Sequence, residues 1–172
     1  VAFLTAGGIA PCLSASIGRL VKNYSEEDPS VKMIGYLNGY KGLLLGKSIP
    51  ISKEVIEGAE ILYQFGGSPI GNSRVKLTNK EDCVKKKLIN QGENPLEIAA
   101  NQLINDKIDI LHTIGGDDTN TTARDLSNFI KLKGIDMTFV GIPKTIDNDI
   151  FPVKRSLGAY TAAHAGAMYF EN

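Results

Sequence analysis

An apolar segment that leads directly into glycines and acidic residues constrains this chain most. Residues 108–114 (Ile-Asp-Ile-Leu-His-Thr-Ile) have the composition of a buried β-strand, and residues 115–119 (Gly-Gly-Asp-Asp-Thr) follow at once. A helical pattern over residues 120–131 comes next. Strand, glycine turn, acidic pair and helix start, in this order, are typical of a phosphate site in an α/β fold. The acidic pair indicates Mg²⁺ between the protein and the phosphate oxygens.

A second acidic loop has the same layout. Residues 137–142 form another apolar run, and residues 143–149 (Pro-Lys-Thr-Ile-Asp-Asn-Asp) follow it. Because parallel strands end at the same edge of a sheet, the two loops should lie close together. The side chains expected to converge there are Asp117, Asp118, Lys144, Asp147 and Asp149. Carboxylates for metal, a lysine for phosphate and a further carboxylate as base make a set suited to phosphoryl transfer.

Strand-like and helix-like segments alternate along the rest of the chain. The expected strands cover residues 1–5, 31–37, 108–114 and 137–142, and the expected helices cover residues 11–24, 53–63, 80–90, 95–104 and 120–131, with a last helix from about residue 157. Residues 38–42 and 65–79 are expected to be loops. This alternation predicts a Rossmann-like α/β fold, a parallel sheet with helices on both faces. A domain boundary is expected near residue 150.

Composition excludes several classes of partner. The chain has 172 residues, a formal net charge of zero and no apolar stretch long enough to span a membrane. Zero net charge argues against nucleic acid or an anionic membrane as partner. The two cysteines, Cys12 and Cys83, lie far apart and match no metal or redox spacing. Unpaired thiols of this kind favour a cytoplasmic protein.

Three motifs together resemble one family. Residues 5–11 (Thr-Ala-Gly-Gly-Ile-Ala-Pro), 115–119 and 143–149 stand in the order and spacing of a phosphofructokinase, and positions 118 and 144 resemble its pyrophosphate-dependent branch. The resemblance implies transfer of a phosphoryl group from pyrophosphate to fructose 6-phosphate, with Mg²⁺, in glycolysis. It also implies a longer, homo-oligomeric protein. Residues 1–150 would then bind the donor, and residues 151–172 would begin a mostly missing lobe for the sugar phosphate.

The resemblance also implies roles for the donor-binding residues. Gly7 and Gly8 would bind the diphosphate through a glycine turn, and Arg74 would contact its oxygens through a bidentate fork. Asp117 and Asp149 would hold the metal ion.

Positions 118 and 144 carry the donor preference. Asp118 stands where ATP-dependent relatives have glycine. Its carboxylate would fill the room of a nucleotide α-phosphate and repel it. Lys144 would neutralise charge on the diphosphate and the leaving phosphate.

The loop after residue 143 would carry the chemistry. Asp147 would act as general base and take the proton from the sugar 1-hydroxyl. Thr145 and Ile146 would contact the substrate beside it.

Simpler interpretations exist for several of these residues. Asp117 and Asp118 would also serve as helix N-caps, Lys144 as a solvated loop lysine, and Asp149 in an Asx turn with Asn148. Residues 42–48 imitate a nucleotide P-loop but have three residues between the glycines instead of four. An ATP-dependent phosphofructokinase and a non-catalytic phosphate-binding subunit stay open as alternatives.

Overall fold

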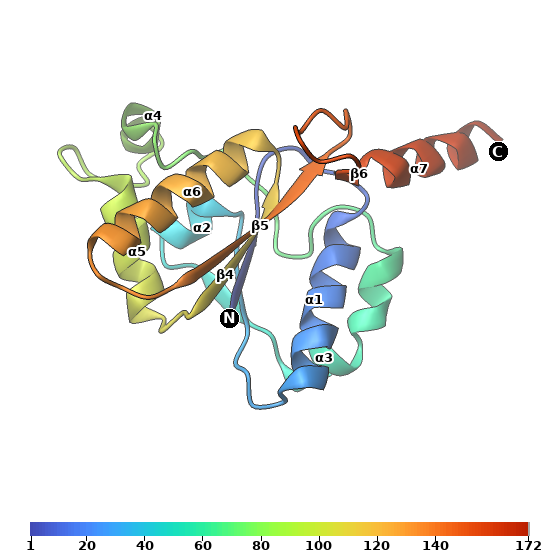
Figure 1. Ribbon diagram of the computed structural model, residues 1–172, viewed down its shortest axis with the longest axis horizontal. Helices are drawn as coiled ribbons and strands as arrows, with labels where there is room; N and C mark the ends of the chain where they lie inside the picture. Colours follow the sequence, from blue (N-terminus) through green and yellow to red (C-terminus); the bar gives the residue numbers. More distant parts are fainter. Residues whose placement is uncertain (172) are drawn as a thin grey trace.

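A single six-stranded sheet organises the computed structural model, which describes residues 1–171 (Figure 1). The strands lie in the order β3-β2-β1-β4-β5-β6. Their bounds are β1 Ala2–Thr5, β2 Ile34–Tyr36, β3 Ser48–Pro50, β4 Ile110–Gly115, β5 Thr138–Thr145 and β6 Leu157–Gly158. Neighbouring strands are parallel except for β3, which pairs antiparallel with β2 at one edge. The predicted α/β architecture is confirmed.

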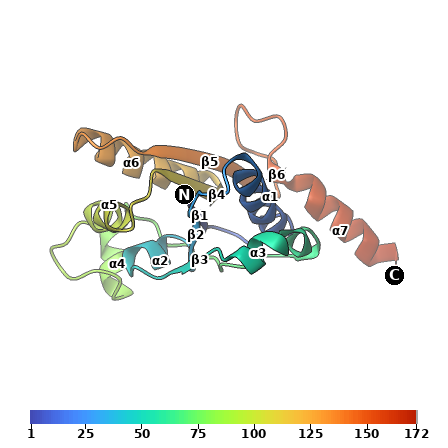
Figure 2. The same cartoon turned by 90° about the horizontal axis from the view of Figure 1, so that it is seen from below.

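Helices cover both faces of the sheet (Figures 1 and 2). Their bounds are α1 Leu13–Glu27, α2 Tyr40–Leu44, α3 Lys53–Glu57, the 3-10 helix η1 Ala59–Gln64, α4 Lys80–Lys85, α5 Pro95–Asn105, α6 Asp117–Leu132 and α7 Ala159–Glu171. Helices α1 and α3 lie on one face, and α2, α5 and α6 lie on the other (Figure 2). Two separate apolar cores result, one on each side of the sheet.

The central strands are buried on both faces because their side chains alternate. In β1, Leu4 joins the core beneath α2, α5 and α6, while its neighbour Phe3 joins the core beneath α1. In β4, Leu111 and Ile114 divide between the two cores in the same way. Continuous apolar runs are characteristic of parallel strands that are covered on both sides. These two strands therefore form a rigid centre from which the turns at their carboxyl ends project.

The predicted loop over residues 38–42 is wrong in its second half. Helix α2 begins at Tyr40, and the antiparallel edge strand β3 follows. Tyr40 is fully buried and its hydroxyl donates a hydrogen bond of 2.8 Å to the carbonyl of Thr119. A Cβ on Gly42 would overlap the carbonyl of Leu37, so the glycine that suggested a loop in fact permits close packing. Tertiary contacts override the weak local signal here.

Several predicted boundaries also move. The expected helix over residues 53–63 divides into α3 and η1 at Gly58, and the helix expected over residues 80–90 ends at Lys85. More important for the site, α6 begins at Asp117 rather than at residue 120. Strand β5 extends to Thr145, three residues beyond the predicted end. The acidic pair is therefore in a helix and the lysine in a strand.

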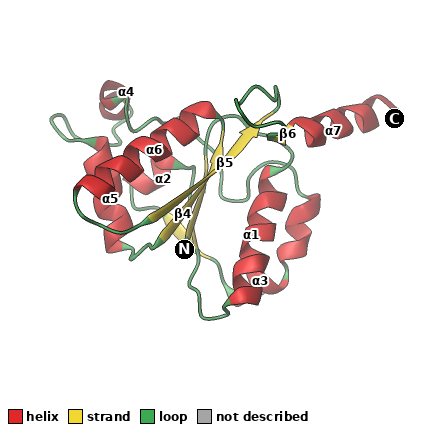
Figure 3. Cartoon of the chain, in the orientation of Figure 1, coloured by secondary structure: helices red, strands yellow, loops and turns green. Residues whose placement is uncertain are grey.

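The last elements project from the body of the fold. Strand β6 pairs with the end of β5, and α7 then extends away from the sheet (Figures 1 and 3). Within the described part of α7 no residue is buried, and Tyr160, Tyr169 and Phe170 are exposed. The division into domains at residue 150 stays a prediction. No helix within residues 1–171 has the length and apolar character needed to cross a membrane.

Candidate functional site

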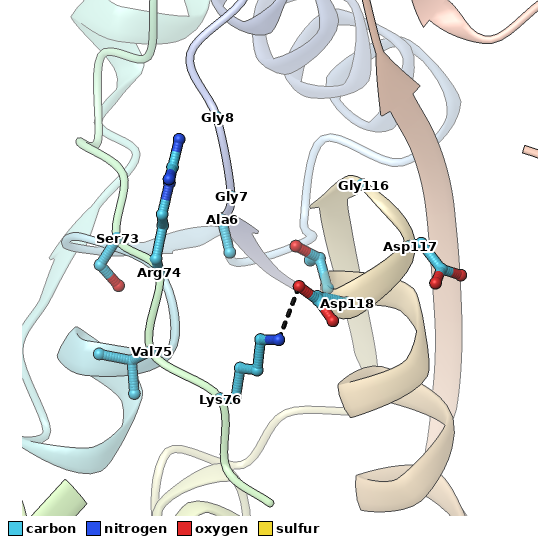
Figure 4. A pocket seen from close by; sticks show the side chains of 11 residues that line it. Ala6, Gly7, Gly8, Ser73, Arg74, Val75, Lys76, Gly116, Asp117 and Asp118 are labelled. Atoms are coloured by element: carbon cyan, nitrogen blue, oxygen red, sulfur yellow. Dashed lines mark ion pairs between the residues drawn. The ribbon is translucent and has the colours of Figure 1, made fainter. Parts of the chain in front are cut away.

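A cavity of about 520 Å³ lies at the carboxyl ends of β1 and β4. Thr5 of β1 pairs with Ile114 of β4, so the turns that follow the two strands leave the same edge of the sheet. Three segments line the cavity: residues 6–8, residues 73–76 and residues 116–119 (Figure 4). The turn after β1 and the start of α6 are thus brought together as expected for turns that follow neighbouring parallel strands, and the loop containing Arg74, selected from the family resemblance, joins them.

Hydrogen bonds with three other segments hold the turn after β1. Gly7 has φ +85°, a conformation that favours glycine, and its N–H donates to the Ser73 carbonyl at 2.9 Å. The Asn72 side-chain amide donates to the carbonyls of Gly7 and Gly8, at 2.9 and 3.2 Å. Lys144 Nζ also donates to the Gly8 carbonyl, at 2.5 Å. The turn carbonyls are therefore engaged by these donors.

The start of α6 forms the opposite wall. Gly116 is the N-cap residue, and no side chain caps this helix. The first backbone N–H groups of a helix lack partners within the helix and carry partial positive charge, which suits an anion. A Cβ on Gly115 would lie only 2.5 Å from the Ala6 carbonyl, so the two turns pack directly against each other. The interpretation of Asp117 and Asp118 as N-caps is wrong.

The two carboxylates of the first turn of α6 point to different sides (Figure 4). Asp118 points across the cavity, where Oδ2 lies 2.7 Å from Lys76 Nζ. Asp117 points the other way, toward the neighbouring strand β5 (Figure 4). The backbone carbonyl of Lys144 lies 3.6 Å from the position of a Cβ on Gly116, so β5 passes close to this end of the helix. The two carboxylates therefore face different parts of the site, Asp118 the cavity and Asp117 the strand β5.

Two cationic side chains of the 65–79 loop reach the cavity. Arg74 is exposed, and its side chain extends toward the Gly8 end (Figure 4). Lys76 lies at the other end, paired with Asp118. Sequence reasoning selected Arg74 and missed both Lys76 and Asn72. Neither residue belongs to a helical or strand-like sequence pattern. Only their closeness to Arg74 in the chain could have indicated that they contribute to the site.

Lys144 is buried within β5, with 5% of its surface exposed. Burial lowers the pKa of its ammonium group, and the positive charge of Arg74 lowers it further. The interpretation of Lys144 as a solvated loop lysine is therefore wrong. Its side chain does not line the cavity but anchors Gly8, which does. Its positive charge thus lies immediately behind the glycine turn.

The loop after β5 carries the remaining predicted residues outside the cavity lining. Ile146, Asp147 and Asp149 are exposed. The Thr145 hydroxyl donates to Asp149 Oδ1 at 3.0 Å and accepts from the Asp147 backbone N–H at 3.2 Å. The predicted convergence of all five charged residues is thus only partly observed.

Asn148 is a further residue that sequence reasoning did not select for this loop. Its Oδ1 accepts hydrogen bonds from the backbone N–H and the hydroxyl of Ser156, at 2.8 and 3.1 Å. Its amide donates to the Lys154 carbonyl at 3.2 Å. Asn148 therefore connects both ends of the segment between β5 and β6.

A metal ion would depend on few protein ligands here. Within residues 1–171, no group of three or more His, Cys, Asp and Glu side chains is arranged to hold one. Asp118 is already paired with Lys76, which leaves Asp117 as the available carboxylate at the helix start. Mg²⁺ typically binds through one or two carboxylates together with substrate phosphates and water. The donor set fits that kind of shared site and does not fit an all-protein cage.

Comparison with known proteins agrees with this arrangement. The family described as "Phosphofructokinase" matches residues 1–172. The chain is 59% identical over 172 residues to the pyrophosphate–fructose 6-phosphate 1-phosphotransferase of Methylomonas methanica and 58% identical to the protein of that name from Methylotuvimicrobium alcaliphilum. Each match covers 100% of this chain and 42% of the relative. The chain thus spans less than half the length of these curated relatives.

A solved structure shows the same fold. The pyrophosphate-dependent phosphofructokinase from Marinobacter aquaeolei superposes with a TM-score of 0.81 at 23% identity, covering 98% of this chain and 39% of that one. The family match extends over the whole sequence, so the chain belongs to the phosphofructokinase family. The family resemblance expected from the three motifs is confirmed.

Proposed function

We propose that the full-length protein transfers a phosphoryl group from pyrophosphate to the 1-hydroxyl of fructose 6-phosphate, giving fructose 1,6-bisphosphate and phosphate. One observation carries the choice of donor: the carboxylate of Asp118 lies across the cavity beside an uncapped helix N-terminus. The side chain at this point leaves room for a diphosphate and fills the space that a longer phosphate chain would need. The names of the relatives at 58 and 59% identity support the same donor and acceptor.

The cavity walls would bind the diphosphate. The free N–H groups at the start of α6 and the glycine turn at Gly7 and Gly8 would approach its oxygens. Arg74 would supply a bidentate cation from the facing loop. Lys144 would add positive charge from behind the turn while keeping the Gly8 carbonyl directed away from the anion. Hydrogen bonds within the chain fix the glycine turn and Lys144, which favours electrostatic stabilisation of the transferred group.

A Mg²⁺ ion would be held by Asp117 and the donor oxygens, with Asp149 as the second protein ligand from the neighbouring loop. When bound, it would neutralise charge that develops on the diphosphate during transfer. Asp117 points toward β5 (Figure 4), and the loop that contains Asp149 follows this strand in the chain. Asp118, paired with Lys76, would take no part in metal binding.

The loop after β5 would supply the base. Asp147 is exposed and would accept the proton of the sugar 1-hydroxyl as that oxygen attacks phosphorus. Thr145 and Ile146 would contact the sugar or the transferred group beside it. The hydrogen bond from the Asp147 N–H to the Thr145 hydroxyl would orient this short segment. A carboxylate in solvent on the acceptor side is compatible with a site that forms fully once the acceptor is bound.

The same proposal extends to the domain organisation, the oligomeric state and the cellular compartment of the full-length protein. Residues 1–150 would form the donor domain, and residues 151–172 would begin a lobe that binds the sugar phosphate. The full-length protein would act as a cytoplasmic homo-oligomer in glycolysis. Light scattering of the full-length protein tests the oligomer, with a monomer mass as the contrary result.

The first experiment supplies the full-length protein with Mg²⁺ and fructose 6-phosphate, together with either pyrophosphate or ATP. Formation of fructose 1,6-bisphosphate is followed in both reactions. We expect turnover with pyrophosphate and at least a hundredfold lower kcat/KM with ATP. Preferential use of ATP would overturn the interpretation of Asp118, and turnover with neither donor would favour a non-catalytic binding subunit.

Asp147→Asn tests the assignment of the base. The amide cannot accept the proton, so kcat should fall by at least about 10²-fold, the usual range for loss of a general base. The dissociation constant for pyrophosphate, measured by calorimetry, should stay within twofold. Asp136→Asn, at an exposed position just before β5, is the matched control. A kcat within tenfold of wild type in the Asp147 variant would place the base elsewhere.

A further inference from the structure

The ion pair between Lys76 and Asp118 joins two cavity walls that are far apart in the chain. Lys76 belongs to the loop before α4, and Asp118 belongs to the first turn of α6. Their charged atoms lie 2.7 Å apart, and both residues line the same cavity (Figure 4). The pair therefore spans the cavity at the end away from Gly8, opposite the end toward which Arg74 extends (Figure 4).

Stability alone does not account for this pair. The side chains are 46% and 69% exposed, and ion pairs with that much solvent contact contribute little to folding. Neither segment needs the pair for its own structure. Asn79 caps α4 through its own side chain. Helix α6 packs through Leu126 and Ile130, which are buried. The position of the pair on the cavity wall therefore suggests a role toward a ligand rather than a role in folding.

An unpaired carboxylate at this position would oppose an anionic donor. Asp118 lies at a helix N-terminus that we assign to a diphosphate, and like charges separated by a few ångströms repel strongly in a partly enclosed site. The ammonium group of Lys76 cancels that charge and also restricts the direction in which the carboxylate points. The carboxylate then occupies space without adding a net negative charge.

We propose that Lys76 is a positioning residue for donor choice: it holds the Asp118 carboxylate across the cavity and neutralises it toward the diphosphate. This inference rests on the proposed function, because it assigns a diphosphate to the cavity. Lys76 acts through Asp118 and not by direct contact with the donor. The donor preference is accordingly set by a pair of residues, only one of which was visible in the sequence motif.

The experiment measures KM and kcat for pyrophosphate in the full-length protein carrying Lys76→Ala or Lys76→Arg. Lys76→Ala should raise KM at least tenfold while kcat changes less than threefold, because the unpaired Asp118 repels the bound donor. Lys76→Arg keeps the charge and should restore KM to within threefold. Lys85→Ala removes an exposed lysine at the end of α4 and should match wild type.

A second background separates positioning from direct binding. In Asp118→Gly no carboxylate is left to neutralise, so adding Lys76→Ala should change KM less than twofold. An equal loss in both backgrounds would show direct contact between Lys76 and the donor and would overturn the proposal. So would a wild-type KM in Lys76→Ala.

Failure of the proposed function would be recognised separately. If wild-type protein turns over no pyrophosphate, calorimetry of pyrophosphate binding to wild type and Lys76→Ala still tests the pair. At least tenfold weaker binding in the variant, absent in the Asp118→Gly background, supports the positioning role. Equal binding to both proteins overturns it.

Discussion

Two neighbouring parts of the site differ in how they are held. The turn that lines the cavity between the ends of β1 and β4 is held by several other segments of the fold. The β1 turn is bound by the 72–73 loop and by Lys144, and it packs against Gly115. The loop between β5 and β6 is largely exposed apart from Ser156, and its hydrogen bonds run mainly within itself, from Thr145 to Ser156.

The donor side of the site is thus fixed by contacts with several other segments, whereas the acceptor loop is held mainly by hydrogen bonds within the loop. Fixed groups are an advantage on the donor side, where a compact and highly charged anion would bind. Fixed dipoles need no reorganisation when charge develops during transfer. A loop that carries the base gains from adapting to the acceptor. Disturbing the donor side should therefore affect the whole fold, whereas disturbing the loop should affect turnover alone.

Gly115→Ala should break the donor side and have the largest effect. The added Cβ would lie 2.5 Å from the Ala6 carbonyl and would overlap the Thr119 side chain. We expect a loss of about 2–3 kcal/mol in the free energy of unfolding, the upper range for overpacking, and at least tenfold weaker pyrophosphate binding. Urea unfolding and calorimetry of the full-length protein measure the two effects.

Gly66→Ala is the matched control for this substitution. A Cβ on Gly66 meets no atom within 4 Å. The free energy of unfolding should therefore stay within about 0.5 kcal/mol of wild type. If Gly115→Ala behaved like this control, the two turns would be less closely packed than the structure indicates, and the comparison would fail.

Asn148→Gly should disturb the acceptor loop alone, with an intermediate effect. Glycine accepts the φ of +54° found at Asn148, so the variant removes the hydrogen bonds to Ser156 and Lys154 without adding backbone strain. We expect kcat to fall about tenfold, because the three hydrogen bonds of the Asn148 side chain that hold the loop are lost. Pyrophosphate affinity should stay within twofold and Tm within about 2 °C.

Lys87→Gly provides the control, because Lys87 has the same φ of +54° and lies far along the chain from the loop. It should leave kcat unchanged. If Asn148→Gly instead weakened pyrophosphate binding as much as it lowered kcat, the donor side and the acceptor loop would be coupled. The two parts of the site would then not be held independently of each other.

The smallest expected effect is a dependence of folding stability on pH, caused by His112 in the central strand β4. His112 of β4 is buried, its Nε2 lies 2.8 Å from the Tyr24 hydroxyl, and burial lowers the pKa of its imidazole. As pH falls below about 6.5, the unfolded chain binds a proton at this residue before the folded chain does. The unfolded state is then favoured, so folding stability falls with falling pH.

His112→Gln should remove this contribution. Between pH 7 and pH 5, the free energy of unfolding of the variant should fall less than that of wild type. The midpoint of urea unfolding at the two pH values gives the measurement. Equal losses in both proteins would show that His112 does not contribute to acid sensitivity of the core.

Local sequence patterns were sufficient to predict the site residues that follow the ends of strands. Gly7, Gly8, Asp117 and Asp118 were predicted because each follows an apolar run directly, and the structure places all four at one cavity. Asn72 and Lys76 could not be predicted in this way. They lie in a loop without periodicity, and their partners are a glycine carbonyl and a carboxylate from other segments.

The sequence by itself determined the four parallel strands β1, β2, β4 and β5, the longer helices between them and the family, because apolar runs, glycines and caps act over a few neighbouring residues. It did not predict helix α2 or the edge strands β3 and β6. Only the tertiary structure decided which charges meet. Lys144 turned inward to the Gly8 carbonyl, Asp118 met Lys76, and Asp147 stayed outside the cavity lining. These outcomes depend on strand register and helix start positions, where a shift of one to three residues redirects a side chain. Such shifts are set by packing across the whole sheet.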